Sequence, residues 1–146
     1  HIYGPFYYAI SITVLVSIYT FQIIPVENFY VSAACLTIMY LGDGMAATIG
    51  VRWGKHKYKT VIGGQKSVEG SVAMFLFGFL GALIGLWFFG ILNYGKIDLL
   101  EAFTLAFLSS LIATFIEAVS PSGFDNLSVP LLTALVMNII HFQIGI

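Results

Sequence analysis

The side chains best suited to chemistry lie at the edges of two strongly apolar runs. Asp43 is inside one run and has a glycine on each side, Gly42 and Gly44, whereas Lys66 and Glu69 stand at the start of the next run. An ionised carboxylate at membrane depth is costly and usually marks a functional site. The two glycines would let a helix unwind and bring its backbone close to a ligand or metal ion. Asp43, Lys66 and Glu69 are therefore the candidate catalytic residues.

Lys66 and Ser67 directly precede a predicted helix. Free N–H groups and the positive dipole end at a helix N-terminus favour phosphate, and Lys66 would add a point charge. Lys55, in the preceding basic loop, is a further candidate for binding a phosphorylated ligand. There is also a structural interpretation, in which Ser67 is the helix N-cap and Glu69 an acid that matches the helix dipole.

A second group of oxygen-bearing side chains, Glu117, Asp125 and Asn126, follows later in the chain. Mg²⁺ takes carboxylates together with substrate phosphates. We therefore expect Asp43, Glu117 and Asp125 to be metal ligands and Asn126 to contact the ligand. Asp and Asn are also common in turns for local hydrogen bonding alone, which is the structural alternative for Asp125 and Asn126.

These residues must be positioned by helices in a membrane. The chain is 59% hydrophobic and 9% charged, whereas charged residues make up about 25% of a soluble domain. Its single cysteine excludes a disulfide framework. The sequence predicts an all-α, polytopic membrane helix bundle with one domain over residues 1–146, and no nucleic-acid partner. A homo-oligomer is compatible with it. Because the chain begins at His1 rather than Met, we expect it to be the C-terminal part of a longer protein.

Runs of roughly 17–25 apolar residues predict about five transmembrane helices. These are Tyr3–Ile24, Phe29–Trp53, Val68–Leu92, Leu99–Val119, and a last one from Val129 to the C-terminus. Lys and Arg concentrate in cytoplasmic loops. The basic loop Gly54–Lys66 should therefore be cytosolic and, by counting spans, so should the loop Ser120–Ser128. Gly81 and Gly85 form a small-xxx-small pair suited to close helix contact.

Three segments, read together, resemble a known family. They are GDGMAATIGVRWGK, GGQKSVEGSVAMF and IEAVSPSGFDNLSVPLLTALV. They resemble the membrane family of CTP-dependent lipid-alcohol kinases, which includes phytol, farnesol and dolichol kinases and is related to phosphatidate cytidylyltransferase. The resemblance covers about Leu41 to Val136, and the third segment looks most like the phytol kinase branch. The Pro-Gly-His-Gly-Gly signature expected of a phosphatidate cytidylyltransferase is absent.

The resemblance implies phosphoryl transfer from CTP to the hydroxyl of a long-chain isoprenoid alcohol at the cytosolic membrane face, with Mg²⁺. It implies that Asp43 and Asp125, with Glu117, handle Mg²⁺ and the triphosphate. Lys66 would offset charge on the transferring phosphate, and Asn126 would orient it.

Several alternatives stay open from the sequence. Glu69 is either a metal ligand or the base that accepts the proton of the alcohol. A lipid cytidylyltransferase shares much of the motif core and would transfer CMP instead of a phosphate. A non-enzymatic transporter would also carry intramembrane acids, although the acids here gather at one face.

Overall fold

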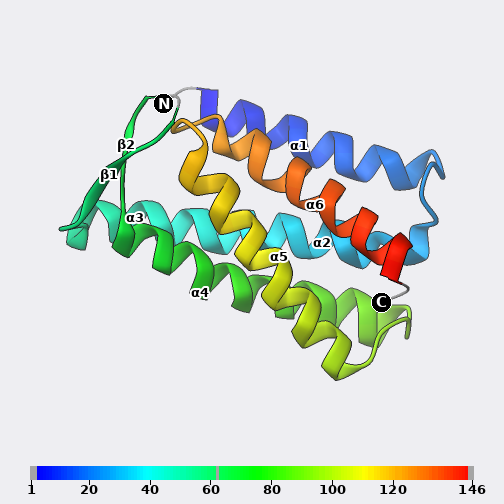
Figure 1. The fold of residues 1–146 in the computed structure, drawn as a ribbon. Coiled ribbons are helices and arrows are strands. Elements are labelled where there is room, and N and C mark those ends of the chain that lie inside the picture. Colours follow the sequence, from blue (N-terminus) through cyan, green and yellow to red (C-terminus); the bar gives the residue numbers. More distant parts are fainter. Residues whose placement is uncertain (1–2, 62, 145–146) are drawn as a thin grey trace.

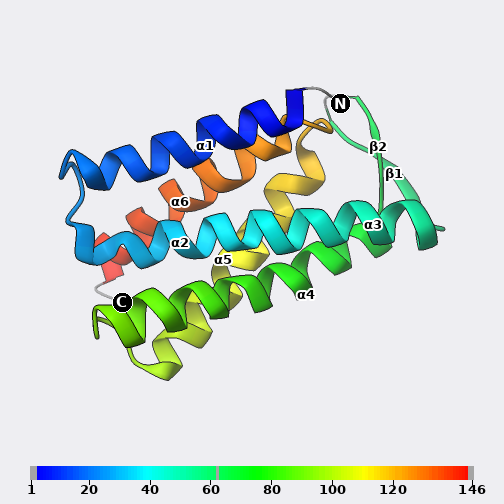
Figure 2. The ribbon, with the colours of Figure 1, turned by 180° about the vertical axis from the view of Figure 1, so that it is seen from behind.

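The computed structural model describes residues 3–61 and 63–144, and these form a bundle of helices with one short hairpin at one end (Figure 1). In chain order the elements are α1 (Tyr3–Thr20), the 3₁₀ turn η1 (Val26–Asn28), α2 (Phe29–Thr37), the π-helical segment η2 (Ile38–Asp43), α3 (Gly44–Trp53), β1 (Lys57–Lys59), β2 (Gln65–Ser67), α4 (Val68–Gly85), the π-helical segment η3 (Leu86–Asn93), α5 (Leu99–Val119) and α6 (Asp125–Ile144). The elements from η1 to α3 join into one long helical rod, which Figure 2 shows from behind.

Within the described residues, three helical stretches are long and apolar enough to cross a membrane. They are Val26–Trp53, Val68–Asn93 and Leu99–Val119. The helices α1 and α6 lie alongside them (Figure 1). The predicted all-α membrane bundle is thus confirmed as the fold class.

Two predicted helix boundaries are wrong. The first helix ends at Thr20 rather than Ile24. The last begins at Asp125, four positions before Val129. It starts early because Asp125 Oδ1 accepts hydrogen bonds from the backbone N–H groups of Gly123 and Asn126, at 2.9 and 3.1 Å. Backbone donors at a helix start need such partners.

Pro130 lies inside α6, although proline is rare in a helix interior. It has no N–H to donate to the carbonyl oxygen of Asn126, four residues earlier. The hydroxyl of Ser11 on α1 donates to that oxygen instead, at 2.9 Å, while also contacting the Tyr7 carbonyl at 3.0 Å. Ser11 is fully buried. A hydroxyl from α1 therefore replaces the hydrogen bond that proline removes from α6.

Glycines bring α4 close to the rod that starts at η1, and we call this contact the glycine seam (Gly42, Gly70, Gly78, Gly81 and Gly85). A Cβ atom at Gly81 would lie 2.6 Å from the Thr37 carbonyl oxygen, and one at Gly85 would lie 3.1 Å from the Ala34 Cα. The close contact predicted for Gly81 and Gly85 is confirmed.

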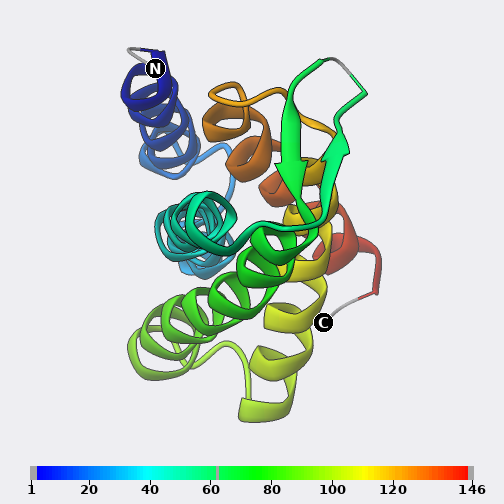
Figure 3. The ribbon, with the colours of Figure 1, turned by 90° about the vertical axis from the view of Figure 1, so that its left-hand side faces the viewer.

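The basic loop predicted between the second and third helices contains a small antiparallel hairpin. Strand β1 pairs with β2, and Tyr58 is opposite Lys66. The Tyr58 hydroxyl also lies 2.7 Å from the Ser71 hydroxyl on α4. Figure 3 shows the hairpin standing at the end of the bundle, above the start of α4. Lys66 is thereby fixed on a strand next to the helix that follows it.

Candidate active site

A cavity of about 670 Å³ lies at the hairpin end of the bundle. Its walls come from the start of α1, from η2 and α3, from the hairpin, from the start of α4 and from the segment between α5 and α6. The lining residues are Gly4, Pro5, Asp43, Ala46, Ala47, Gly50, Val51, Lys57, Gln65, Lys66, Ser67, Gly70, Ser71, Glu117, Ser122, Gly123, Asp125 and Asn126. Six predicted site residues from three separate motifs thus share one cavity: Asp43, Lys66, Ser67, Glu117, Asp125 and Asn126.

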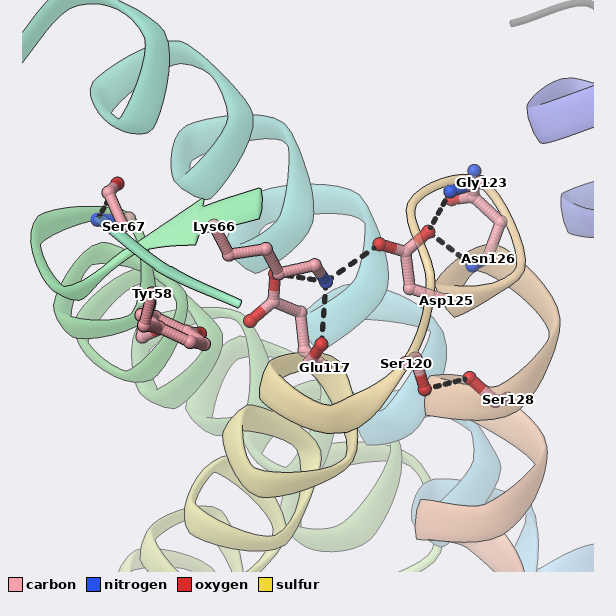
Figure 4. Close-up of polar contacts among 11 residues, drawn as sticks. Tyr58, Lys66, Ser67, Glu117, Ser120, Gly123, Asp125, Asn126 and Ser128 are labelled. Atoms are coloured by element: carbon pink, nitrogen blue, oxygen red, sulfur yellow. Dashed lines mark hydrogen bonds and ion pairs between the residues drawn. The ribbon is translucent and has the colours of Figure 1, made fainter. Parts of the chain in front are cut away.

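Lys66 is held between two carboxylates (Figure 4). Its Nζ atom lies 2.6 Å from Glu117 Oε1 and 3.0 Å from Asp125 Oδ2, and it also donates to the main-chain oxygen of Glu117. All three side chains are less than 10% exposed. Burial alone would lower the pKa of Lys66, but the charges of Glu117 and Asp125 and the hydrogen bonds to them outweigh burial and raise that pKa above its ordinary value of 10.5. Lys66 is therefore a fixed positive charge.

Asp43 is the last residue of the π-helical segment η2 and is half-buried at the cavity wall. Its side chain forms no hydrogen bond or ion pair with another of the described residues. The sequence suggested that the helix unwinds at its glycines, but it continues through a π-helical turn. Such a distortion is frequent at functional sites. Gly42 packs against Met74 of α4, and neither Gly42 nor Gly44 lines the cavity.

Asp125 and Asn126 take up their positions through the turn before α6. Asp125 uses one carboxylate oxygen for the local backbone bonds and the other for Lys66. Asp125 thus makes the local hydrogen bonds of the structural interpretation and also lines the cavity. The side-chain amide of Asn126 lies against α1, where a Cβ atom at Gly4 would come within 2.9 Å of its Nδ2.

Ser67 is the N-cap of α4, as its structural interpretation predicted. Its hydroxyl oxygen accepts the backbone N–H of Gly70 at 3.1 Å, and its side chain is buried at the cavity wall. The first turn of α4 thus meets the cavity beside Lys66, which is the arrangement that favours a phosphate group.

Besides Gly42 and Gly44, two further predicted site residues lie outside the cavity wall, Glu69 and Lys55. Glu69 Oε1 contacts His56 Nδ1 at 2.7 Å, and the Glu69 carboxylate accepts the His56 backbone N–H at 3.2 and 3.3 Å. The His56 side chain is 79% exposed. Glu69 therefore fastens the start of the hairpin to α4, and its predicted catalytic role rests on the sequence alone.

The relatives of this chain are phytol kinases. It is 39% identical over 137 residues to a phytol kinase of Synechocystis sp. (93% of this chain and 54% of the relative). It is 36% identical over 140 residues to a probable chloroplastic phytol kinase of Glycine max (94% and 41%). It is 33% identical over 135 residues to one of Triticum aestivum (91% and 42%). The chain is a homologue of the phytol kinases. This confirms the resemblance to isoprenoid-alcohol kinases.

The matches of this phytol kinase homologue to its relatives cover about nine-tenths of the chain. The chain spans about half the length of the curated relatives it matches. No family model matches it. No solved structure matches it significantly.

Sequence reasoning missed part of the cavity wall in this phytol kinase homologue. Gln65 reaches the cavity from the hairpin, together with Lys57 of the basic loop, and Gly4 and Pro5 reach it from α1. The alternating Lys-Tyr-Lys pattern around Tyr58 is typical of a strand and could have indicated that Lys57 has a defined direction. Nothing in the apolar first helix indicated that it meets the site.

The predicted Mg²⁺ ligands of the phytol kinase homologue can be tested against its donor atoms. Asp43, Glu117 and Asp125 supply hard oxygens at one cavity, whose lining also includes the cations Lys57 and Lys66. Within the described ranges, however, no three Asp, Glu, His or Cys side chains are grouped closely enough to hold a metal ion. The donor chemistry fits Mg²⁺. The metal site itself stays a prediction.

Proposed function

We propose that this chain carries the catalytic site of a kinase that transfers the γ-phosphate of CTP to the hydroxyl of a long-chain isoprenoid alcohol of the phytol type. One observation supports this most directly. In a homologue of phytol kinases, the residues of three separate motifs meet at one cavity, with Asp43, Lys66 and Asp125 among them.

The cavity has the parts that phosphoryl transfer requires, which are positioning and neutralisation of charge rather than covalent chemistry. Lys66 is a buried cation that can offset charge on the transferring phosphate, and the first turn of α4 presents backbone N–H groups beside it. Asn126 orients the phosphate chain. Mg²⁺, when bound, would be held by Asp43 and Asp125, with Glu117 as the third predicted ligand, and would neutralise the phosphate oxygens.

We place this site at the cytosolic face of the membrane. Five of the six Lys and Arg side chains lie between Arg52 and Lys66, at the hairpin end (Figure 1). Lys96, the sixth, pairs with Glu27 at 3.0 Å at the opposite end. Such an asymmetry is typical of a cytoplasmic face. The nucleotide then reaches the cavity from the cytosol, while the alcohol comes from the bilayer.

The test is a transfer assay on the full-length protein in detergent, with γ-labelled CTP and a panel of phytol, farnesol, geranylgeraniol and a polyprenol. Label on an alcohol, with CDP released, supports the proposal, and ATP offered in parallel decides the donor. Transfer of CMP from α-labelled CTP would identify a cytidylyltransferase instead. No transfer in either assay would overturn the kinase function and favour a transporter.

A further inference from the structure

The cavity combines a buried charged cluster with a stretch of uncharged wall. Lys66, Glu117 and Asp125 form the cluster. Between α1 and α3 the cavity wall is small or apolar, with Gly4, Pro5, Ala46, Ala47, Gly50 and Val51. We call this part of the wall the mouth, because Pro5, Ala47 and Val51 in it are exposed. The helix α1 packs mainly on α6, and α3 packs mainly on α4, so the two sides of the mouth belong to different parts of the bundle (Figure 3).

Glu117 has a buried oxygen atom that lacks a donor. Its Oε1 accepts from Lys66, but its Oε2 is enclosed and has no hydrogen-bond partner among the described residues. The side chain is 8% exposed. A buried carboxylate oxygen left without a donor is costly. A ligand O–H group that reaches this oxygen would remove that cost.

We propose that the acceptor alcohol binds with its hydroxyl on Glu117 Oε2 and with its hydrocarbon chain leaving the cavity through the mouth between α1 and α3. This inference rests on the proposed kinase function and assigns Glu117 to the alcohol rather than to the metal ion. The small side chains of Ala46, Ala47 and Gly50 leave room for the chain. Beyond them Val51 is 87% exposed and continues the apolar path toward lipid.

The chemistry follows from this position. As the alcohol oxygen bonds to the γ-phosphorus of the nucleoside triphosphate, its proton passes to Glu117 Oε2. The bond from the γ-phosphorus to its bridging oxygen breaks, and the nucleoside diphosphate leaves with that electron pair. Lys66, bonded to Oε1, keeps Glu117 ionised and orients it for this transfer. Glu69 is not needed as the base, because its carboxylate is bonded to His56 outside the cavity wall.

The mouth is tested by filling it. Ala47→Phe places a ring in the mouth, whereas Thr48→Phe adds the same ring at the next position of α3, which does not line the cavity. We expect Ala47→Phe to lower kcat/KM for a twenty-carbon alcohol about tenfold or more, in line with the loss from a misplaced substrate, and Thr48→Phe to change it little. Equal losses in both variants would overturn the proposed path.

A binding readout keeps this test separate from catalysis. A long-chain alcohol with a photoreactive diazirine in its chain should label α1 near Pro5 and α3 near Ala47 in the wild-type protein. Labelling confined to α4, α5 or α6 would overturn the path. Labelling at the mouth without phosphoryl transfer to any alcohol would instead retain the binding mode and overturn the proposed kinase function.

The role of Glu117 is tested by three matched substitutions. Glu117→Gln keeps the size of the side chain but cannot take the proton, so we expect kcat to fall about a hundredfold or more, with nucleotide binding retained. Glu27→Gln makes the same change at the opposite, exposed end and serves as the control. If Glu117→Gln keeps its turnover while Glu69→Gln loses it, the assignment to Glu117 is overturned.

Discussion

Lys66 and Glu117 are 51 positions apart, yet the Lys66 ammonium contacts both the side chain and the main-chain oxygen of Glu117. This contact joins the hairpin to the end of α5. It brings the second sequence motif to the third, and Asp125 extends it to the start of α6. The buried ion cluster therefore serves as a structural joint as well as a part of the candidate site.

Removing the lysine from this joint should destabilise the protein. Lys66→Met leaves two buried carboxylates without their cation, and breaking a buried pair in this way costs about 3–5 kcal/mol. We expect a clearly lower melting temperature in detergent. Adding Glu117→Gln to Lys66→Met should restore part of the loss, since one uncompensated charge is removed. Two substitutions with simply additive effects would contradict the coupling.

Removing the charge of Asp43 should lower the activity without lowering the stability. Its side chain forms no hydrogen bond or ion pair with the other described residues and is half-buried beside other acids. Asp43→Asn should therefore keep or slightly raise the melting temperature, while the transfer rate falls about a hundredfold or more, as for the loss of one important electrostatic group. Full turnover in a well-folded Asp43→Asn protein would remove Asp43 from the site.

The alkaline stability of the protein should depend on Lys66. Its folded-state pKa is raised above 10.5. The stabilisation from the charged lysine is therefore complete below pH 10.5 and is lost as the pH rises through the folded-state value. The difference in melting temperature between wild type and Lys66→Met should be constant near neutral pH and shrink on the alkaline side. A difference that stays constant throughout would contradict this origin of the stabilisation.

Ser11 should matter only while position 130 is a proline. Ser11→Ala leaves the partly buried Asn126 carbonyl without a donor, at a cost of about 1–3 kcal/mol. Pro130→Ala returns an N–H group that can reach the same oxygen. The loss caused by Ser11→Ala should therefore be smaller in the Pro130→Ala background, and a cycle of melting temperatures for the four proteins measures this coupling. The same loss in both backgrounds would rule it out.

The two glycines beside Asp43 should respond differently to alanine. A Cβ atom at Gly42 would lie 2.9 Å from the Met74 sulfur and 3.1 Å from the Met74 carbonyl oxygen, whereas nothing lies within 4 Å of one at Gly44. Gly42→Ala should cost about 1–3 kcal/mol through overpacking. Gly44→Ala should leave the melting temperature unchanged or higher. If Gly44→Ala nevertheless lowers turnover, the backbone there approaches the ligand, as the sequence suggested.

The helices could be predicted because each is a long apolar run, and the predicted run Leu99–Val119 coincides with α5. The start of α6 could not be predicted, since Pro130 reads as a boundary unless Ser11 is known to supply the missing hydrogen bond. The hairpin was missed because strands of three residues hardly rise above a basic loop in the sequence. Counting the membrane spans was enough to predict that Lys66 and the acids lie at the same end of the bundle. The hydrogen bond between Glu69 and His56 could not be predicted, because it depends on how the hairpin packs against α4.

The glycine seam has a mechanical consequence. Backbone atoms are in close contact along Gly70, Gly78, Gly81 and Gly85. The helix α4 and the rod from η1 to α3 should therefore move as one rigid unit, with little movement of one relative to the other. Any widening of the mouth during turnover is then expected from movement of α1, because α6 is held to the rod and to α5 by packing and to Lys66 by Asp125. Spin labels across α1 and α3 should report a changing distance through the catalytic cycle, while a pair across α3 and α4 should stay fixed.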